Sequence, residues 1–367
     1  MRIDSTIAEN DPRMPATWRV LSALLRDEPL SQADLRERTG LSHPVIVQRV
    51  AQLRQAGLIS MGKPSSGRPG RPRTPMSFNW DYRRLLVVEV HNSGVTALIS
   101  NLHGEALAAP VVLSVQNWNF SEVATALEAA ITVALAQEGA PWAGIAVVLP
   151  GAVSADGASI RECSGLPECR DLALGTELSA KFGYPVTLYS DGTTLASAAW
   201  AARDAAAQTI IAVSLRHEMR IGLGLIVEGR LVASAGSAPG GLASLSILGG
   251  ATLGEVLSDT TVRLQGLRSL AEALAPTVLA LTPDNLIIQG DAIWSDADAD
   301  LFHSALQNCC GAEVMRGLRV EVRPYRAQES LEGALGLLSA QLLDLRRGKV
   351  GQWARSAVPE PEPIILY

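Results

Sequence analysis

The chain has 367 residues, of which 47% are hydrophobic and 19% are charged, and its formal net charge is −6. This length is enough for two or three domains with a large core, and the composition is not that of a small disulfide-rich chain. We expect a soluble cytoplasmic protein without a membrane partner, because we find neither a signal-peptide pattern nor an apolar run long enough to span a bilayer.

Charge is distributed unevenly along the chain. Residues 1–84 carry 14 Lys/Arg and 8 Asp/Glu, a net charge of +6, whereas the remainder carries 17 basic and 29 acidic residues, a net charge of −12. A basic N-terminal part on an acidic remainder indicates that only the N-terminal part meets nucleic acid.

The four cysteines have the spacing of neither a zinc finger nor a redox motif; they are Cys163, Cys169, Cys309 and Cys310. We interpret them as reduced structural thiols, and we expect no metal site.

In chain order, a polar stretch over residues 1–13 precedes apolar residues at helical spacing over residues 15–26. A second helix is predicted to follow Ser31, whose hydroxyl can cap it, and Asp34 places negative charge in its first turn. Gly40 permits the left-handed backbone that ends a helix.

A third helix is predicted after a short turn. Ser42 can cap this helix, and Pro44 in the first turn loses no hydrogen bond. Apolar residues then recur at helical spacing, and Leu58 and Ile59 lead into a strand. A Gly-, Pro- and Arg-rich segment, GRPGRPR, follows at residues 67–73. Two short helices joined by a tight turn, with this basic segment as a wing, predict a winged helix-turn-helix domain over residues 1–74.

In such a domain the N-terminal part of the second helix of the motif enters the major groove of DNA. We therefore predict contacts to bases or phosphates from Ser42, His43, Pro44, Val45, Gln48 and Arg49. Gln48 is suited to adenine, and Arg49 to guanine or a phosphate. The basic wing suits the minor groove and supplies Lys63, Arg68, Arg71 and Arg73. A protein-binding helical hairpin with a basic loop is the alternative; we favour DNA because turn, caps and wing agree.

The remaining chain predicts an α/β body. After a linker at residues 75–84, buried strands, turns and helices alternate, and a second strand-turn-strand opening begins near Thr209. The two openings predict a duplicated α/β unit with a ligand-holding cleft between its halves. We place the first lobe at residues 85–200, the second lobe with a closing helix at residues 201–348, and an extended or disordered proline-rich tail at residues 349–367.

Four segments of the body carry a resemblance to a known family: LPGAVSADG, YSDGTTLASAAW, RIGLGLIVEGRLV and LTPDNLIIQGDAI. The later three are the more informative, because they occur in order with plausible spacing. Together with the GRPGRPR head the four segments resemble the ROK family (repressors, open reading frames and sugar kinases) from about Ala16 to Arg347. The head makes the chain similar to the ROK regulators, such as the N-acetylglucosamine and xylose repressors, because the family's kinases lack it. The resemblance implies a two-lobed ribonuclease-H-like, actin-like body.

The phosphate loops depart from the family pattern. The D-x-G-G-T loop of the kinases aligns with Glu89–Ser93, where His91 and Asn92 replace glycines. The second loop, G-T-G-x-G, aligns with residues 218–222, where Glu218 opposes a phosphate charge. A nucleotide phosphate needs the close backbone approach that glycine permits, so the comparison with the family indicates a body without ATP binding.

The sugar site departs as well. The family's Asn-Asp pair, whose aspartate takes a proton from the sugar hydroxyl, aligns with Ser190 and Asp191. The family's later glutamate and histidine align with Gly241 and Ser244, and the cysteine-rich zinc segment is replaced by GGATLGEVL, so no zinc is expected. Ser190 and Asp191 are therefore the candidate ligand contacts, and a cap or turn at the start of a helix near residue 193 is an equal alternative for Asp191.

We expect a DNA-binding transcription regulator, a repressor by the family's commoner mode, with no enzymatic activity, no catalytic residues and no cofactor. Its expected partners are double-stranded operator DNA, a sugar or other small metabolite as effector, and its own copies in a homodimer or dimer of dimers. A regulator whose body is a ligand-insensitive scaffold is the first alternative, and a sugar kinase with a DNA-binding head is the second.

Overall fold

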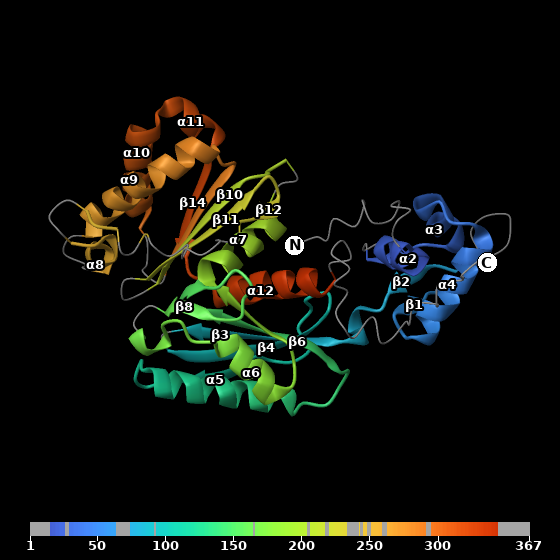
Figure 1. Ribbon diagram of the computed structural model, residues 1–367. Coiled ribbons are helices and arrows are strands. Elements are labelled where there is room, and N and C mark those ends of the chain that lie inside the picture. The colour runs from blue at the N-terminus through green and yellow to red at the C-terminus, as the bar shows by residue number, and fades with distance from the viewer. Residues whose placement is uncertain are drawn as a thin grey trace, which may run out of the picture.

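The computed structural model describes residues 15–25, 29–63, 74–91, 93–163, 166–203, 206–216, 220–232, 242, 245–247, 251–258, 263–290 and 295–343. A small helical head stands at one end of a larger body made of two α/β lobes (Figure 1). Among the described residues, no helix is both long and apolar enough to cross a membrane.

The described part of the head contains three helices, α2 (Ala16–Leu24), α3 (Gln32–Thr39) and α4 (His43–Gln55). The predicted start of α3 is confirmed as a capping box: the Ser31 N–H donates to Asp34 Oδ2 at 2.8 Å, and the Asp34 N–H donates to Ser31 Oγ at 3.4 Å. Gly40 ends the helix with φ = 66°, as predicted. The capping box therefore fixes the start of α3, and Gly40 begins the short turn between α3 and α4.

A small antiparallel sheet completes the head. Strand β1 (Ile59–Met61) pairs with β2 (Met76–Phe78), and Leu30 forms a bridge to Met76. The prediction of a linker at residues 75–84 is therefore wrong, since it contains β2 and the 3₁₀ helix η1 (Trp80–Tyr82). Met76 and Phe78 are buried in the head, because alternate residues of a strand point to the same side.

The first lobe is a five-stranded sheet in the order β5 (Val111–Ser114), β4 (Gly94–Asn101), β3 (Arg84–His91), β6 (Trp142–Leu149) and β9 (Val186–Ser190). The pairs β5–β4 and β4–β3 are antiparallel, and the pairs β3–β6 and β6–β9 are parallel. One face is covered by α5 (Phe120–Leu135) and α6 (Leu174–Phe182) (Figure 1). A hairpin of β7 (Gly151–Val153) and β8 (Ile160–Cys163), and the 3₁₀ helix η2 (Pro167–Cys169), connect β6 to α6.

The second lobe repeats this plan with β12 (Arg230–Leu231), β11 (Arg220–Val227), β10 (Ile210–Arg216), β13 (Asn285–Gly290) and β14 (Arg319–Pro324). Two antiparallel pairs again precede two parallel pairs, which confirms the predicted duplication. Its outer side carries α8 (Leu253–Ser258), α9 (Arg263–Leu281), α10 (Asp296–Cys310) and α11 (Ala312–Gly317).

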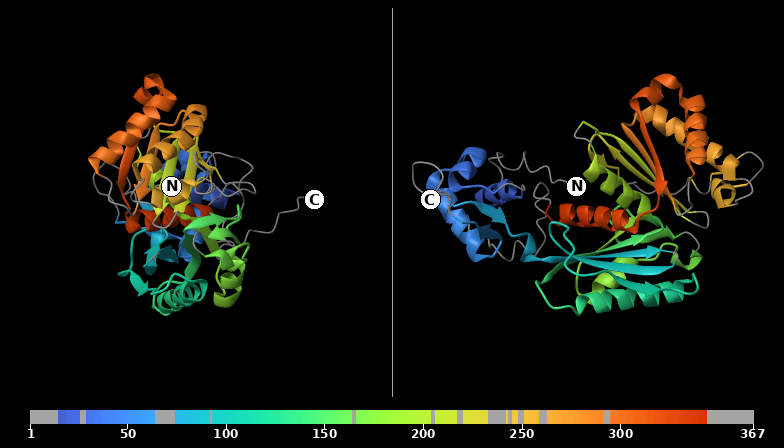
Figure 2. Two further views of the ribbon diagram at one scale, coloured as in Figure 1. Left: turned by 90° about the vertical axis from the view of Figure 1, so that its left-hand side faces the viewer. Right: turned by 180° about the vertical axis from the view of Figure 1, so that it is seen from behind.

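Two helices, α7 (Asp191–Ala202) and α12 (Ala327–Leu342), lie between the two sheets (Figures 1 and 2). They approach closely at Gly333, where an added Cβ would lie 1.9 Å from the carbonyl oxygen of Thr194. The hydroxyl groups of Thr194 and Ser330 are 3.2 Å apart.

The lobe boundary predicted at residues 200 and 201 needs a correction at both helices. Although α7 follows the first sheet in sequence, it packs on the second sheet through Leu195 and Ala199. The closing helix α12 returns to the first sheet, where Leu335 and Leu338 join its core. Each of these helices therefore covers the sheet of the other half, an exchange that sequence order alone does not specify.

Candidate nucleic-acid interface and the interlobe carboxylate

Helix α4 is anchored in the head by one apolar face. Its buried side chains are Ile46, Val50 and Leu53. Ser42 occupies the N-cap position, as predicted, but its side chain makes no capping hydrogen bond. The prediction that the Ser42 side chain caps the helix is therefore wrong, and Ser42 is exposed at the start of the helix.

The predicted DNA-contacting residues at the start of α4 lie on the side of the helix that turns away from this core or at its edge. Ser42, His43, Pro44 and Gln48 are exposed, and Val45 and Arg49 are half-buried. Arg49 Nη1 donates to Gln52 Oε1 at 2.7 Å, which holds the guanidinium against its own helix.

The predicted wing contacts are only partly described. Lys63 is exposed just beyond β1. Arg68, Arg71 and Arg73 lie outside the described residues.

Sequence reasoning missed four exposed residues of α4. Val47 is 42% exposed, and Ala51, Arg54 and Gln55 are exposed as well. The signal was available, because successive helical residues differ by about 100° around the axis. A residue next to the buried Ile46 therefore turns toward the rim of the outer face.

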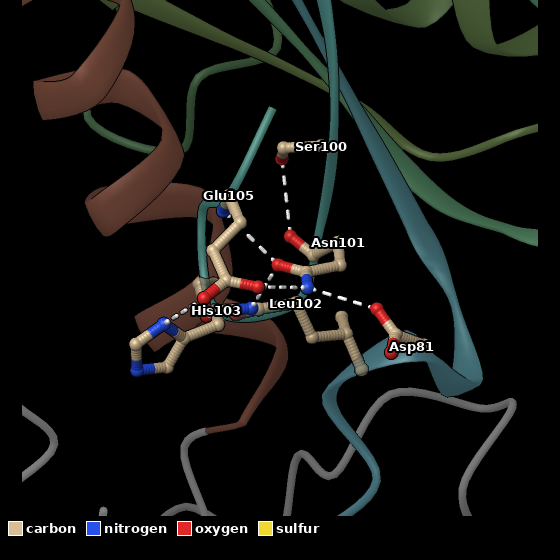
Figure 3. Close-up of polar contacts among 7 residues, drawn as sticks. Asp81, Ser100, Asn101, Leu102, His103 and Glu105 are labelled. Atoms are coloured by element: carbon tan, nitrogen blue, oxygen red, sulfur yellow. Dashed lines mark hydrogen bonds and ion pairs between the residues drawn. The ribbon is translucent and has the colours of Figure 1, made fainter. Parts of the chain in front are cut away.

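The head joins the body through a hydrogen-bonded turn. Asn101, at the end of β4, donates from Nδ2 to Asp81 Oδ1 of η1 and to Glu105 Oε2, both at 2.9 Å (Figure 3). Its Oδ1 accepts the backbone N–H groups of His103 and Glu105 at 3.0 Å. One buried amide thus fixes both the turn after β4 and the 3₁₀ helix that leaves the head.

Apolar contacts reinforce this junction. The Trp80 ring lies edge-on between Phe78 and His103, with centroid distances of 4.8 and 4.9 Å. The Leu102 N–H donates to the Trp80 carbonyl at 3.0 Å, and the Leu102 carbonyl accepts from Ser339 Oγ of α12 at 2.7 Å. A single buried cluster runs from the head helices through this junction to α12.

In the segment aligned with the first phosphate loop of the kinases, the described side chains form hydrogen bonds with one another and with the second lobe. The His91 ring lies 2.9 Å from Ser93 Oγ and 3.0 Å from Thr96 Oγ1. Glu89, at the position of the family's aspartate, is 1% exposed and accepts a hydrogen bond from the Tyr325 hydroxyl. This hydrogen bond joins the second lobe to the first lobe at the end of β3.

The aspartate aligned with the family's catalytic base lies at the start of α7. Ser190 caps this helix by accepting the Thr193 N–H at 3.3 Å, so the cap is Ser190 and not Asp191. The Asp191 carboxylate is buried and accepts hydrogen bonds from the Gly192 N–H at 2.9 Å and from Ser214 Oγ of β10 at 3.0 Å.

Two glycines of β11 have a packing role. A Cβ at Gly222 would lie 2.3 Å from Asp191 Oδ1, and a Cβ at Gly224 would lie 2.0 Å from the Gly192 carbonyl oxygen. Because no side chain fits there, these glycines let the start of α7 press onto β11. Glu218, Gly241 and Ser244 lie outside the described residues.

No metal-binding cluster of His, Cys, Asp and Glu occurs in the part of the chain that the structure describes. Three of the four cysteines are buried and Cys309 is exposed. A hydrogen bond from Cys163 lowers the pKa of the Cys169 thiol.

Comparison with known proteins supports the division into head and body. Residues 14–68 match the family model described as MarR family. No curated protein matches the chain.

The solved structures with this fold include a ROK family transcriptional regulator described as a homolog of the E. coli MLC protein. It is 19% identical, with 90% of this chain and 97% of that chain covered and a TM-score of 0.67. The inorganic polyphosphate/ATP-glucomannokinase from Arthrobacter sp. strain KM is 20% identical, with 72% and 99% covered and a TM-score of 0.51. A ROK family protein from Streptococcus pneumoniae in complex with sucrose is 16% identical, with 72% and 99% covered and a TM-score of 0.52.

The regulator aligns with head and body together, whereas these two other proteins align with a smaller share of the chain. The chain thus has the fold of the ROK family transcriptional regulators, with a MarR-type winged helix-turn-helix head and a two-lobed, kinase-like α/β body.

Proposed function

We propose that this protein is a DNA-binding transcription regulator that acts in the cytoplasm. The observation that carries this proposal is the outer face of α4, where His43, Pro44 and Gln48 are exposed on a winged helix-turn-helix head. A helix in this position fits the major groove, and the basic segment after Lys63 fits the backbone or the minor groove.

The proposal is tested by selecting bound fragments from genomic DNA with the wild-type protein and with Gln48→Ala. We expect a short pseudo-palindrome that the variant binds about 10–100-fold more weakly, since a bidentate base contact contributes roughly 1–3 kcal/mol. Gln265→Ala is the matched control, because Gln265 is an exposed glutamine on α9 of the body. Diffuse binding that is equal in all three proteins would contradict the proposal.

We also propose that the body has no kinase activity. The bonded His91 ring and the buried Asp191 carboxylate support this, because phosphoryl transfer depends on positioned phosphates as well as on a base. ATP turnover should stay at background with glucose, mannose or sucrose present. Turnover above background that Asp191→Asn abolishes would reverse this part of the proposal.

We propose that the body pairs two copies of the chain, so that two heads meet the two halves of a pseudo-palindrome. A sugar or related metabolite is the proposed effector, with Ser190 and Asp191 as its candidate contacts. It releases DNA only if it favours one arrangement of the paired heads. The sucrose complex of the Streptococcus pneumoniae ROK protein supports a sugar as the ligand class.

A specific observation favours a second candidate, a scaffold body without an effector. The Asp191 carboxylate is already hydrogen-bonded to Ser214 and to the Gly192 N–H, so the protein itself occupies the group that would hold a sugar. A thermal-shift series with sugars and sugar phosphates separates the two candidates. Stabilisation by one compound, lost in Asp191→Asn, supports sensing, and uniform silence supports the scaffold.

A further inference from the structure

The outer face of α4 has an unusual chemical character for a surface that meets DNA. Residues four positions apart lie above one another on a helix, so His43, Val47 and Ala51 form one exposed row, and Pro44 and Gln48 form the next. Apart from the His43 imidazole and the Gln48 amide, these side chains are hydrocarbon. The nearest arginine, Arg49, is half-buried and bonded to Gln52, and Arg54 stands in the last turn.

Val47 stands out within this face because it is 42% exposed. Ile46, Val50 and Leu53 already anchor the helix, so packing of the head does not require an exposed valine beside them. Helix propensity does not favour it either, because a β-branched side chain loses χ1 freedom in a helix. An exposed aliphatic group beside an exposed amide instead indicates that both side chains contact whatever α4 binds.

The chemistry of the base edges in the major groove indicates which base pair these side chains of α4 would contact. The 5-methyl of thymine is the apolar group there, and glutamine matches the N6 and N7 atoms of adenine, whereas guanine is read by arginine or lysine. The exposed first two turns of α4 carry the aliphatic group and the amide, and no outward lysine or arginine.

We propose that Val47 is a specificity-determining residue that contacts the 5-methyl group of a thymine, and that Val47 and Gln48 together select A·T base pairs in each half-site. The inference rests on the proposed function in DNA binding. Adjacent helical residues differ by about 1.5 Å along the axis and about 100° around it. Val47 and Gln48 therefore address the same or neighbouring base pairs.

The test begins with selection of binding sites from a random double-stranded DNA library by the full-length protein. Each thymine of the selected half-site is then replaced singly by deoxyuridine, which lacks only the 5-methyl group. We expect one position at which this replacement weakens wild-type binding about fourfold, the effect of one buried methyl group.

Variants of Val47 identify the partner of that methyl group. Val47→Ala should bind the thymine and deoxyuridine sites equally, and Val47→Thr, which keeps one γ-methyl group, should retain part of the preference. Val133→Ala is the matched control, because Val133 is a 49% exposed valine on α5 of the body. It should discriminate between the two sites as the wild type does.

Two different outcomes distinguish a failure of the role of Val47 from a failure of the proposed DNA binding. A selected site at which every deoxyuridine replacement is neutral, or at which Val47→Ala keeps the wild-type preference, overturns the role of Val47 while DNA-specific binding stands. Selection that enriches no sequence, with binding unchanged in Gln48→Ala, overturns the proposed function itself.

Discussion

The close approach of α7 and α12 at Gly333 gives a prediction about stability. An added Cβ at Gly333 would lie 1.9 Å from the Thr194 carbonyl oxygen, 2.8 Å from the Thr194 carbonyl carbon and 3.2 Å from the Ala198 nitrogen. All three are backbone atoms, so the Gly333→Ala methyl group fits only if the two helices separate. Overpacking of this kind costs about 1–3 kcal/mol.

Two smaller terms act on the same variant. Separation weakens the hydrogen bond between Thr194 and Ser330, which contributes about 1 kcal/mol. The higher helix propensity of alanine relative to glycine raises the free energy of unfolding by roughly 1 kcal/mol. The free energy of unfolding should therefore fall by about 1–3 kcal/mol.

Scanning calorimetry measures this effect, with Gly317→Ala as the matched control. Gly317 ends α11, and its added Cβ would meet no atom within 4 Å, so the control should keep or raise the unfolding temperature. Gly333→Ala should lower that temperature by about 2–5 °C. A rise equal to that of the control would refute the reasoning, because it would mean that α7 and α12 have room for the methyl group.

Three further predictions concern charge and thiols. In a DNA titration against salt, Lys63→Ala should reduce the slope of log affinity against log salt by about one, whereas Gln48→Ala should lower affinity without changing the slope. With a thiol reagent, Cys309 should react rapidly in the native protein because it is exposed. The buried Cys163, Cys169 and Cys310 should react only after unfolding. A native Cys309→Ser variant that reacts as fast as the wild type would contradict this prediction. Hydrogen bonds from Asn117 lower the pKa of Glu122. The ionised Glu122 therefore stabilises the fold fully above the pKa that it has in the unfolded chain, and this stabilisation is lost as the pH falls through its pKa in the folded protein. Glu122→Gln should flatten the acid side of a plot of the free energy of unfolding against pH.

Local signals predicted much of the head because they act within a few residues. The Ser31 and Asp34 capping box and the left-handed Gly40 need only the backbone around them. The strand β2 was missed since it is three residues long and follows the basic segment. Its alternating Met76 and Phe78 become informative only once their partner strand is known.

Distant pairings explain what the sequence did not specify in the body. The exchange of α7 and α12 depends on contacts such as Thr194 with Ser330, 136 residues apart. The state of Asp191 depends on Ser214, and its burial under β11 depends on Gly222 having no side chain. The motif identified the carboxylate, but only the fold shows that the protein itself donates hydrogen bonds to it.

The junction limits how an effector could act on DNA. The head and α12 share one buried cluster, and Asn101 and Ser339 bond the turn after β4 to η1 and to α12. A change in the angle between the lobes that displaces α12 must therefore either carry the head with it or break this cluster. Close-packed interfaces adopt discrete arrangements and do not deform continuously. Moving the head together with α12 therefore costs less free energy than breaking the cluster. An effector in the body would then change the spacing of two paired heads without touching α4, and a scaffold body would hold that spacing constant.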